Sequence, residues 1–205
     1  VVNMPSLQWL SLGSNTVNDL SPLAGLINLD WVGIGNNQIK SLAPLNGMPG
    51  LRQIDAHNNR ITNIGLTDSF RLEWLNLQNN AIQNLEGFSG APNLNGLYLD
   101  NNPIENLDGI AQFSRLRHLS LNETEFRSLA VIGELYGLGE LSLERNNITD
   151  IAPLASLTRL WHLNLRNNQI SQLGETFARY GNTSIELDGN PVICRELEQA
   201  RESGS

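Results

Sequence analysis

The sequence has a single cysteine, Cys194, so no disulfide bond can form within the chain. It has no apolar run close to the roughly 20 residues that a membrane-spanning helix needs. Positive charge is scarce, because 13 basic residues stand against 21 acidic ones and the formal net charge is -8. This balance argues against a nucleic-acid backbone or an anionic membrane as the main partner, so we expect no nucleic-acid binding and no membrane insertion.

Sequence patterns of common enzymes are also missing. The chain has no glycine-rich phosphate loop, no G-x-S-x-G elbow and no H-E-x-x-H zinc pattern. Its glycines are spread along the chain, and Cys194 lies far from any histidine in the sequence. We therefore expect no catalytic residues and no cofactor.

One repeated pattern fills the chain instead. Leucines recur as L-x-x-L-x-L followed by an asparagine, and this order returns every 22 residues, once after 21. The pattern resembles the leucine-rich repeat, whose copies have roughly 20–29 residues. We predict about nine turns, which begin at Leu7, Leu29, Leu51, Leu72, Leu94, Leu116, Leu138, Leu160 and, in degenerate form, Asn182.

In each turn, two leucines alternate with an outward residue, as in a short strand with one buried face. In LWHLNLRNNQI, Leu163 and Leu165 are predicted to point inward. No single turn can bury that face, so the turns stack and their strands form a parallel sheet. The asparagine after each strand can satisfy backbone groups at the bend. Stacking aligns Asn15, Asn37, Asn59, Asn80, Asn102, Asn146, Asn168 and Asn190, with Thr124 in the sixth turn.

The returning half of the turn carries L-S-P-L, L-A-P-L or I-A-P-L around Pro22, Pro44 and Pro153. Proline fixes φ and cannot take part in a central strand, so these segments favour short 3₁₀ or extended structure. The predicted fold class is an α/β leucine-rich repeat solenoid. Its curved parallel β-sheet forms the concave face, and 3₁₀ or extended segments form the convex face.

The repeat also sets the expected domain boundaries. The array spans residues 1–191, and residues 1–6 align with the tail of an earlier turn. That start points to a chain excised from a longer protein, or to one covered by a neighbour. Residues 192–205 leave the pattern and predict a capping helix and tail. Cys194 is expected to pack against the last turn as a small hydrophobe.

The segments NNQIKSLAPL, NNITDIAPLASLTRLWHLNLRNNQIS and LSPLAGL resemble the internalin-type leucine-rich repeat proteins of bacteria. The resemblance covers roughly residues 1–192. It implies a protein on the surface of a bacterium or outside it, which binds a partner in its concave face through exposed aromatic anchors. Similar repeats occur in intracellular regulators, so the cytoplasm is the alternative location.

Tryptophan is concentrated on the predicted concave face. Trp9, Trp31 and Trp74, three of the four tryptophans, occupy one outward strand position, and Tyr98 lies at the next outward position. Outward tryptophans in a cluster mark a contact surface, because Trp and Tyr often dominate interface energetics. The alternative is a cross-strand stack that serves stability.

Two neighbouring features complete this expectation. The glycines at positions 13, 33 and 35 lie beside the tryptophans and are expected to leave the indole faces uncovered. Trp161 lies one residue before its strand position, so we expect it to pack at the edge of the sheet and leave it outside the site.

Polar residues follow along the same face. His118, Glu140 and His162 form a row on three successive strands, which is a weak candidate for a divalent metal site. A solvated hydrogen-bonded row is the favoured interpretation, because a fourth ligand is missing. The predicted polar contacts to a partner are Asp55, His57, Gln78, Asp100, Glu144 and Arg166.

The leading hypothesis is a non-catalytic module that binds another protein with its concave face. Protein is favoured over sugar because the face is long, gently curved and mixed in charge. A glycan is possible as well, since tryptophans also stack on sugar rings. A structural spacer without a ligand of its own is the third alternative, and it predicts that the outward tryptophans tolerate substitution.

Overall fold

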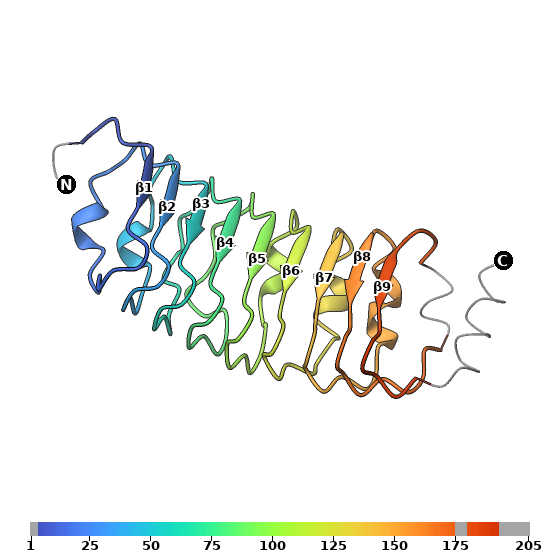
Figure 1. Ribbon diagram of the computed structural model, residues 1–205. Coiled ribbons are helices and arrows are strands. Elements are labelled where there is room, and N and C mark those ends of the chain that lie inside the picture. Colours follow the sequence, from blue (N-terminus) through green and yellow to red (C-terminus); the bar gives the residue numbers. More distant parts are fainter. Residues whose placement is uncertain (1–3, 175–179, 193–205) are drawn as a thin grey trace.

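The computed structural model describes residues 4–174 and 180–192, and these form an elongated coil of stacked turns (Figure 1). One parallel sheet runs the length of the coil, with its strands in sequence order. Each strand has three residues: β1 Trp9–Ser11, β2 Trp31–Gly33, β3 Gln53–Asp55, β4 Trp74–Asn76, β5 Gly96–Tyr98, β6 His118–Ser120, β7 Glu140–Ser142, β8 His162–Asn164 and β9 Ser184–Glu186.

The strands pair in the register that the repeat predicts. Trp9 pairs with Trp31, and Trp74 pairs with Gly96, so each column of the sequence pattern becomes a row across the sheet. The central residue of each strand points inward, and Val32 and Leu75 are fully buried there. The predicted curved solenoid with its parallel sheet on the concave face is confirmed.

Short 3₁₀ helices lie on the far side of the core from the strands (Figure 1). Pro22, Pro44 and Pro153 stand in the first turns of three of them, as the fixed φ of proline favours. The predicted capping helix over 192–205 lies outside the described residues except for Val192, and so does Cys194. The 3₁₀ helices are η1 Ser21–Leu23, η2 Ala43–Leu45, η3 Ile110–Gln112, η4 Ile132–Glu134 and η5 Ala152–Ser156.

The aligned asparagines, which we call the asparagine column, join each turn to the next by hydrogen bonds. Asn168, 1% exposed, donates from Nδ2 to the carbonyl oxygens of Leu143 (2.9 Å) and Leu165 (3.0 Å). Its Oδ1 accepts the backbone N–H of Asn146 and of Ile148, both at 3.0 Å. One side chain thus satisfies buried backbone groups in two successive turns, which is the role predicted from the repeat.

Thr124 interrupts this column, as the sequence predicts. Its hydroxyl donates to the carbonyl of Leu121 at 2.9 Å, but it is too short to reach back across the turn before it. Asn102 and its counterparts accept a backbone N–H from the preceding turn. Without such an acceptor at 124, the N–H of Ile104 bonds to the carbonyl of Asn102 at 2.8 Å. The sixth turn is therefore held to the fifth less completely.

Candidate functional site

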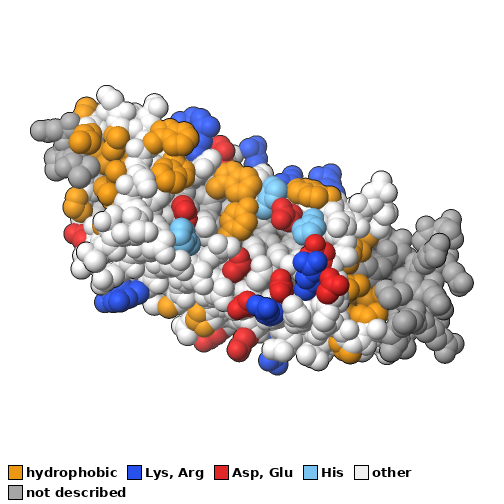
Figure 2. Space-filling model, in the orientation of Figure 1, with side chains coloured by type: hydrophobic (Ala, Val, Ile, Leu, Met, Phe, Trp, Pro, Cys, Tyr) orange, Lys and Arg blue, Asp and Glu red, His pale blue; other side chains and the backbone are white. Residues whose placement is uncertain are grey.

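Aromatic side chains line the face of the sheet where the strands begin. Trp9 is 67% exposed, whereas Trp31 and Trp74 are partly buried on the same face. Figure 2 shows this face, with hydrophobic side chains gathered over the first five strands and charged ones over the later strands. The tryptophans therefore project outward from the coil, as expected from their position in the repeat.

The glycines beside the tryptophans leave space in which the indole rings pack against the backbone. We call such a glycine the seat of the ring. A Cβ atom at Gly33 would lie 2.3 Å from the Trp31 ring, and one at Gly96 would lie 2.1 Å from the Trp74 ring. Both are far below a normal contact, so only glycine allows the indoles to lie against the sheet. The expectation that glycines leave these rings uncovered is wrong for Gly33, because one face of Trp31 rests on it.

The rings form two contacting groups. Trp9 and Trp31 lie 6.1 Å apart between ring centroids, with a tilt of 32°. Trp74 stacks on Tyr98 at 6.1 Å and contacts His118 at 5.0 Å. Such offset and tilted pairs are attractive, so the cross-strand stacking that favours stability is present.

Trp161 extends the second group, which the sequence argument missed. Its ring lies edge-on to His118 at 5.4 Å, and the side chain is 49% exposed. Gly139, the aligned residue of the preceding turn, provides its seat, since a Cβ there would lie 1.6 Å from the ring. A glycine aligned with an outward tryptophan one turn away was the available signal.

A pocket separates the two aromatic groups. It has a volume of about 340 Å³ and lies over β3, between the tryptophans of β2 and β4. Trp74 leans over Gly96 on β5 and therefore away from β3, which keeps the pocket open. The pocket is lined by Trp31, Gln53, Ile54, Asp55, Trp74, Asn76 and Tyr98.

Two side chains of this pocket, Tyr98 and Asp55, carry polar groups. Burial, followed by the nearby carboxylates of Glu140 and Asp100, raises the pKa of Tyr98, so its hydroxyl keeps its proton near neutral pH. The Asp55 carboxylate accepts a hydrogen bond from His57 Nδ1 at 2.7 Å. The pocket thus combines aromatic walls with a hydroxyl and a carboxylate.

A chain of hydrogen bonds holds the His57 ring in place. Asn58 Nδ2 donates to Asn36 Oδ1 at 2.9 Å, and Asn36 Nδ2 approaches His57 Nε2 at 3.1 Å. Because the amide nitrogen can only donate, Nε2 accepts and the ring proton lies on Nδ1. In this arrangement His57 Nδ1 donates to the Asp55 carboxylate, and Nε2 accepts from Asn36.

Gln78 and Asp100 belong to a tighter network. Asp100 is 7% exposed and accepts the Ser120 hydroxyl at 2.5 Å and the Asn122 backbone N–H at 2.6 Å. Gln78 Nε2 also donates to Asp100. The exposure expected for Asp100 is not found, because neighbouring turns supply donors that bury its carboxylate.

Ion pairs dominate the far end of the face. Arg166 lies 2.9 Å from Asp188 and 3.1 Å from Glu186. The hydrogen bond to Arg166 and then its charge lower the pKa of Asp188. Glu144 lies 3.7 Å from Arg145, its ion-pair partner among the described residues.

The metal candidate does not assemble. His118 Nδ1 and Glu140 Oε2 lie 2.9 Å apart, and the His118 ring is occupied by its contacts with Trp74 and Trp161. Within residues 4–174 and 180–192, no group of three or more His, Cys, Asp or Glu side chains could hold a metal ion. His118, Glu140 and His162 thus form a polar row beside aromatic rings and are not gathered into a metal-binding group.

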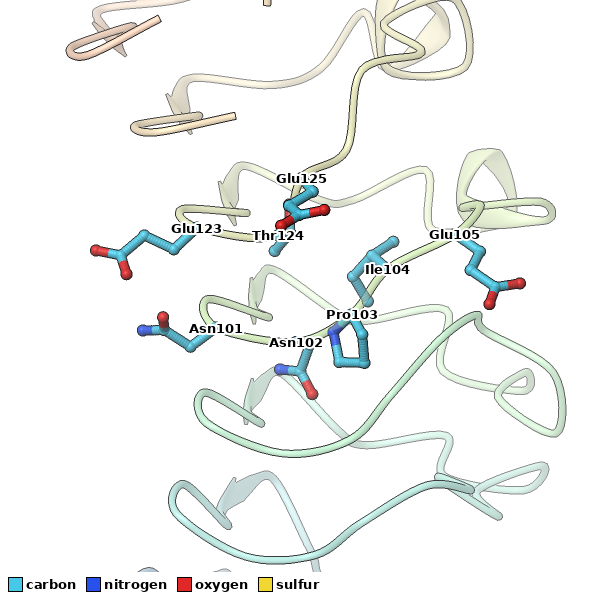
Figure 3. Close-up of a pocket in the computed structure, with 8 residues that line it drawn as sticks. All are labelled: Asn101, Asn102, Pro103, Ile104, Glu105, Glu123, Thr124 and Glu125. Carbon is cyan, nitrogen blue, oxygen red and sulfur yellow. The ribbon is translucent and has the colours of Figure 1, made fainter. Parts of the chain in front are cut away.

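A larger hollow lies at the turns that follow β5 and β6, where Thr124 interrupts the asparagine column (Figure 3). Its volume is about 720 Å³. The acidic residues that line it do not converge, since Glu105 and Glu123 point apart in Figure 3. Glu123 also lies 2.7 Å from Arg145. The hollow follows from the interrupted column and has no cluster of groups aimed at a ligand.

The sequence matches the family described as leucine-rich repeats in two copies, at residues 27–68, 71–112 and 138–178. These segments cover more than half of the chain. The chain belongs to the leucine-rich repeat family. A comparison with curated protein sequences finds no match. Among the described residues, no helix of this repeat protein is long and apolar enough to cross a membrane.

Solved structures place the repeats in the internalin type. The internalin InlF of Listeria monocytogenes superposes with a TM-score of 0.84 at 25% identity, over 91% of this chain and 56% of that one. This repeat array thus spans little more than half of the InlF structure. Internalin C2 of the same organism gives 0.81 at 29% identity, over 87% of this chain and 80% of that one.

A third structure extends the likeness in fold only. The LRIM1/APL1C complex contains a chain with a TM-score of 0.80 and 22% identity, which this repeat array matches over 97% of its own length and 37% of that chain. At this identity the comparison supports the coil of parallel turns and no more.

Proposed function

We propose that the chain is a non-catalytic module whose concave sheet binds another protein, with Trp9, Trp31, Trp74 and Tyr98 as anchors. The observation that carries this proposal is the open pocket between Trp31 and Trp74 on the outward face. Tryptophan and tyrosine supply most of the binding energy in many interfaces, and they do so from desolvated pockets. A repeat coil supplies a rigid frame that holds such side chains ready.

The polar groups around the anchors would supply specificity. Asp55, His57 and Gln78 lie on the same face and are partly exposed, so a partner can reach them. Asp100 would act indirectly, by holding Gln78 and Asn122 in place. Glu144 and Arg166 would contribute weaker contacts at the far end, because exposed charges gain little from pairing.

The aromatic contacts also serve stability, and this is the argument for a spacer. Stacking alone accounts for the pairs Trp9–Trp31 and Trp74–Tyr98. It does not account for the exposure of Trp9 at 67% and Trp161 at 49%, nor for a pocket held open by glycine. Large apolar side chains left at an open pocket are typical of binding surfaces.

The internalin type favours a bacterial protein on the cell surface or outside the cell, as part of a longer polypeptide. This location belongs to the proposal and rests on the likeness to InlF and internalin C2.

A screen of two double variants tests the proposal. Trp31→Ala/Trp74→Ala removes the pocket walls, whereas Phe70→Ala/Tyr136→Ala removes two aromatics that are 61% and 64% exposed outside the strands. Candidate surface proteins and a glycan array are probed with the wild type and both variants. A protein ligand that binds the wild type and the control but not the tryptophan variant is the expected result.

Two results contradict it. Glycans that bind in place of proteins, with the same loss in the tryptophan variant, favour a carbohydrate-binding module. A protein that binds the tryptophan variant as tightly as the wild type refutes the anchor assignment. Circular dichroism and the melting temperature of each variant show that the array remains folded.

A further inference from the structure

We propose that the pocket between Trp31 and Trp74 receives an arginine side chain of the partner. This inference rests on the proposed function and adds the chemistry of the group that enters the pocket. Its basis is the combination of two indole walls, a charged carboxylate and an acidic surrounding face.

The walls suit a flat cation. Trp31 on β2 and Trp74 on β4 are separated by one strand, so their backbones lie about 10 Å apart at the usual strand spacing. That spacing leaves room for one planar group between the two indoles. Indole is the strongest of the aromatic partners for a cation, and the guanidinium plane of arginine stacks on aromatic faces.

Asp55, which lies between the two indoles in the lining of the pocket, supplies the negative charge. His57 Nδ1 donates a hydrogen bond to Asp55 Oδ1 at 2.7 Å, and Asn36 Nδ2 approaches His57 Nε2 at 3.1 Å. Asp55 is the carboxylate that lines this pocket. Its other oxygen, Oδ2, has no hydrogen-bond partner among the described residues. A guanidinium N–H that donates to this oxygen forms a charge-assisted bond while the plane stacks on the indoles.

The negative charge of the surrounding outward residues also favours a cation. The outward strand positions carry six carboxylates but only one basic residue that is always charged, Arg166. Arg166 itself is paired with Asp188 and Glu186 at the far end of the face. A basic partner is thus attracted over the length of the sheet, and an acidic one is repelled. A neutral sugar could stack on the same indoles and hydrogen-bond to Asp55, but the acidic face would not attract it over a distance.

The experiment is an NMR titration of the full chain with the peptide acetyl-Gly-Arg-Gly-amide. A second peptide carries citrulline in place of arginine, which keeps the shape and removes the charge. The indole N–H signals of Trp31 and Trp74 report on the pocket, and the signal of Trp161, whose ring packs on His118, serves as an internal control. We expect the arginine peptide to shift the two pocket signals and to bind about tenfold more tightly than the citrulline peptide.

A matched pair of variants isolates the carboxylate. Asp55→Asn keeps a hydrogen-bond acceptor for His57 but removes the charge, whereas Asp188→Asn removes an exposed carboxylate at the far end of the face. We expect Asp55→Asn to weaken binding of the arginine peptide about tenfold, as loss of a charge-assisted bond implies, and Asp188→Asn to leave it within about twofold.

Three outcomes overturn the inference: equal binding of both peptides, unchanged binding in Asp55→Asn, or pocket shifts with methyl β-glucoside but not with arginine. None of these bears on whether Trp31→Ala/Trp74→Ala loses a protein partner. Failure of the arginine assignment is therefore distinguishable from failure of the proposed function.

Discussion

The first five strands and the last four use one scaffold for two kinds of surface. In both parts, three-residue strands pair in register and asparagines bridge successive turns. In the first part, outward tryptophans rest on glycines and enclose a pocket. In the second, outward residues that follow β8 and β9 form ion pairs such as Arg166–Asp188. Inward residues keep the coil together, and outward residues are free to differ.

This difference shows where function can be located in a repeat protein. A buried leucine in one turn has the same neighbours as its counterpart in the next, so it carries no information about a partner. The outward position is constrained only by adjacent turns, as Gly96 is by Trp74. An outward residue that differs from its counterparts in other turns, such as an aromatic beside a glycine, is therefore the feature to test.

The largest effect on stability is expected from the asparagine column, and it should be equal in the two parts. Asn80→Ala and Asn168→Ala should each lower the free energy of unfolding by about 1–3 kcal/mol, because buried backbone groups lose their partners. Chemical denaturation of both variants measures this loss. Asn15→Ala is the control, since Asn15 is exposed and its amide bonds only within its own turn. A neutral Asn80→Ala would show that the first part is held together by its stacked aromatics instead.

Much of this organisation could be predicted from the sequence. The period of the leucines sets the strands, the inward residues and the asparagine column, because each depends only on position within a turn. The direction of a side chain depends also on the aligned residues of adjacent turns. For that reason the part played by Trp161 and the burial of Asp100 emerged only in three dimensions. The packing of Trp31 on Gly33, two residues on in the same strand, depends on the ring's own conformation and emerged there as well.

A smaller effect should come from filling a glycine seat in the aromatic part. Gly96→Ala places a methyl group where the Trp74 ring lies, so the ring must move toward the pocket. We expect the Trp74 indole signal to shift in the NMR spectrum and partner affinity to fall about tenfold, the size of one good aromatic contact. Gly25→Ala is the matched control, because nothing lies within 4 Å of its added methyl group. If the Trp74 signal does not shift in Gly96→Ala, the Trp74 ring does not pack on Gly96.

The smallest effect is expected in the charged part. Arg166→Gln removes the hydrogen bond and the charge that lower the pKa of Asp188, so this pKa should rise toward its ordinary value. In the wild type, the pair stabilises the fold above the ordinary carboxyl pKa, and the gain is lost as pH falls through the lowered value. A ¹³C titration of the carboxyl group measures the change. Asp19, whose pKa is lowered by its hydrogen bonds with Ser21, should keep its value in the same variant.

The most direct test of the central claim is the affinity of a protein partner for two double variants, measured by calorimetry. We predict that Trp31→Ala/Trp74→Ala weakens binding about 100-fold or more, as the loss of two anchor residues implies. Glu144→Ala/Arg166→Ala should weaken it less than about tenfold, because exposed charges contribute little. Equal losses, or a larger loss in the charged part, would contradict the account.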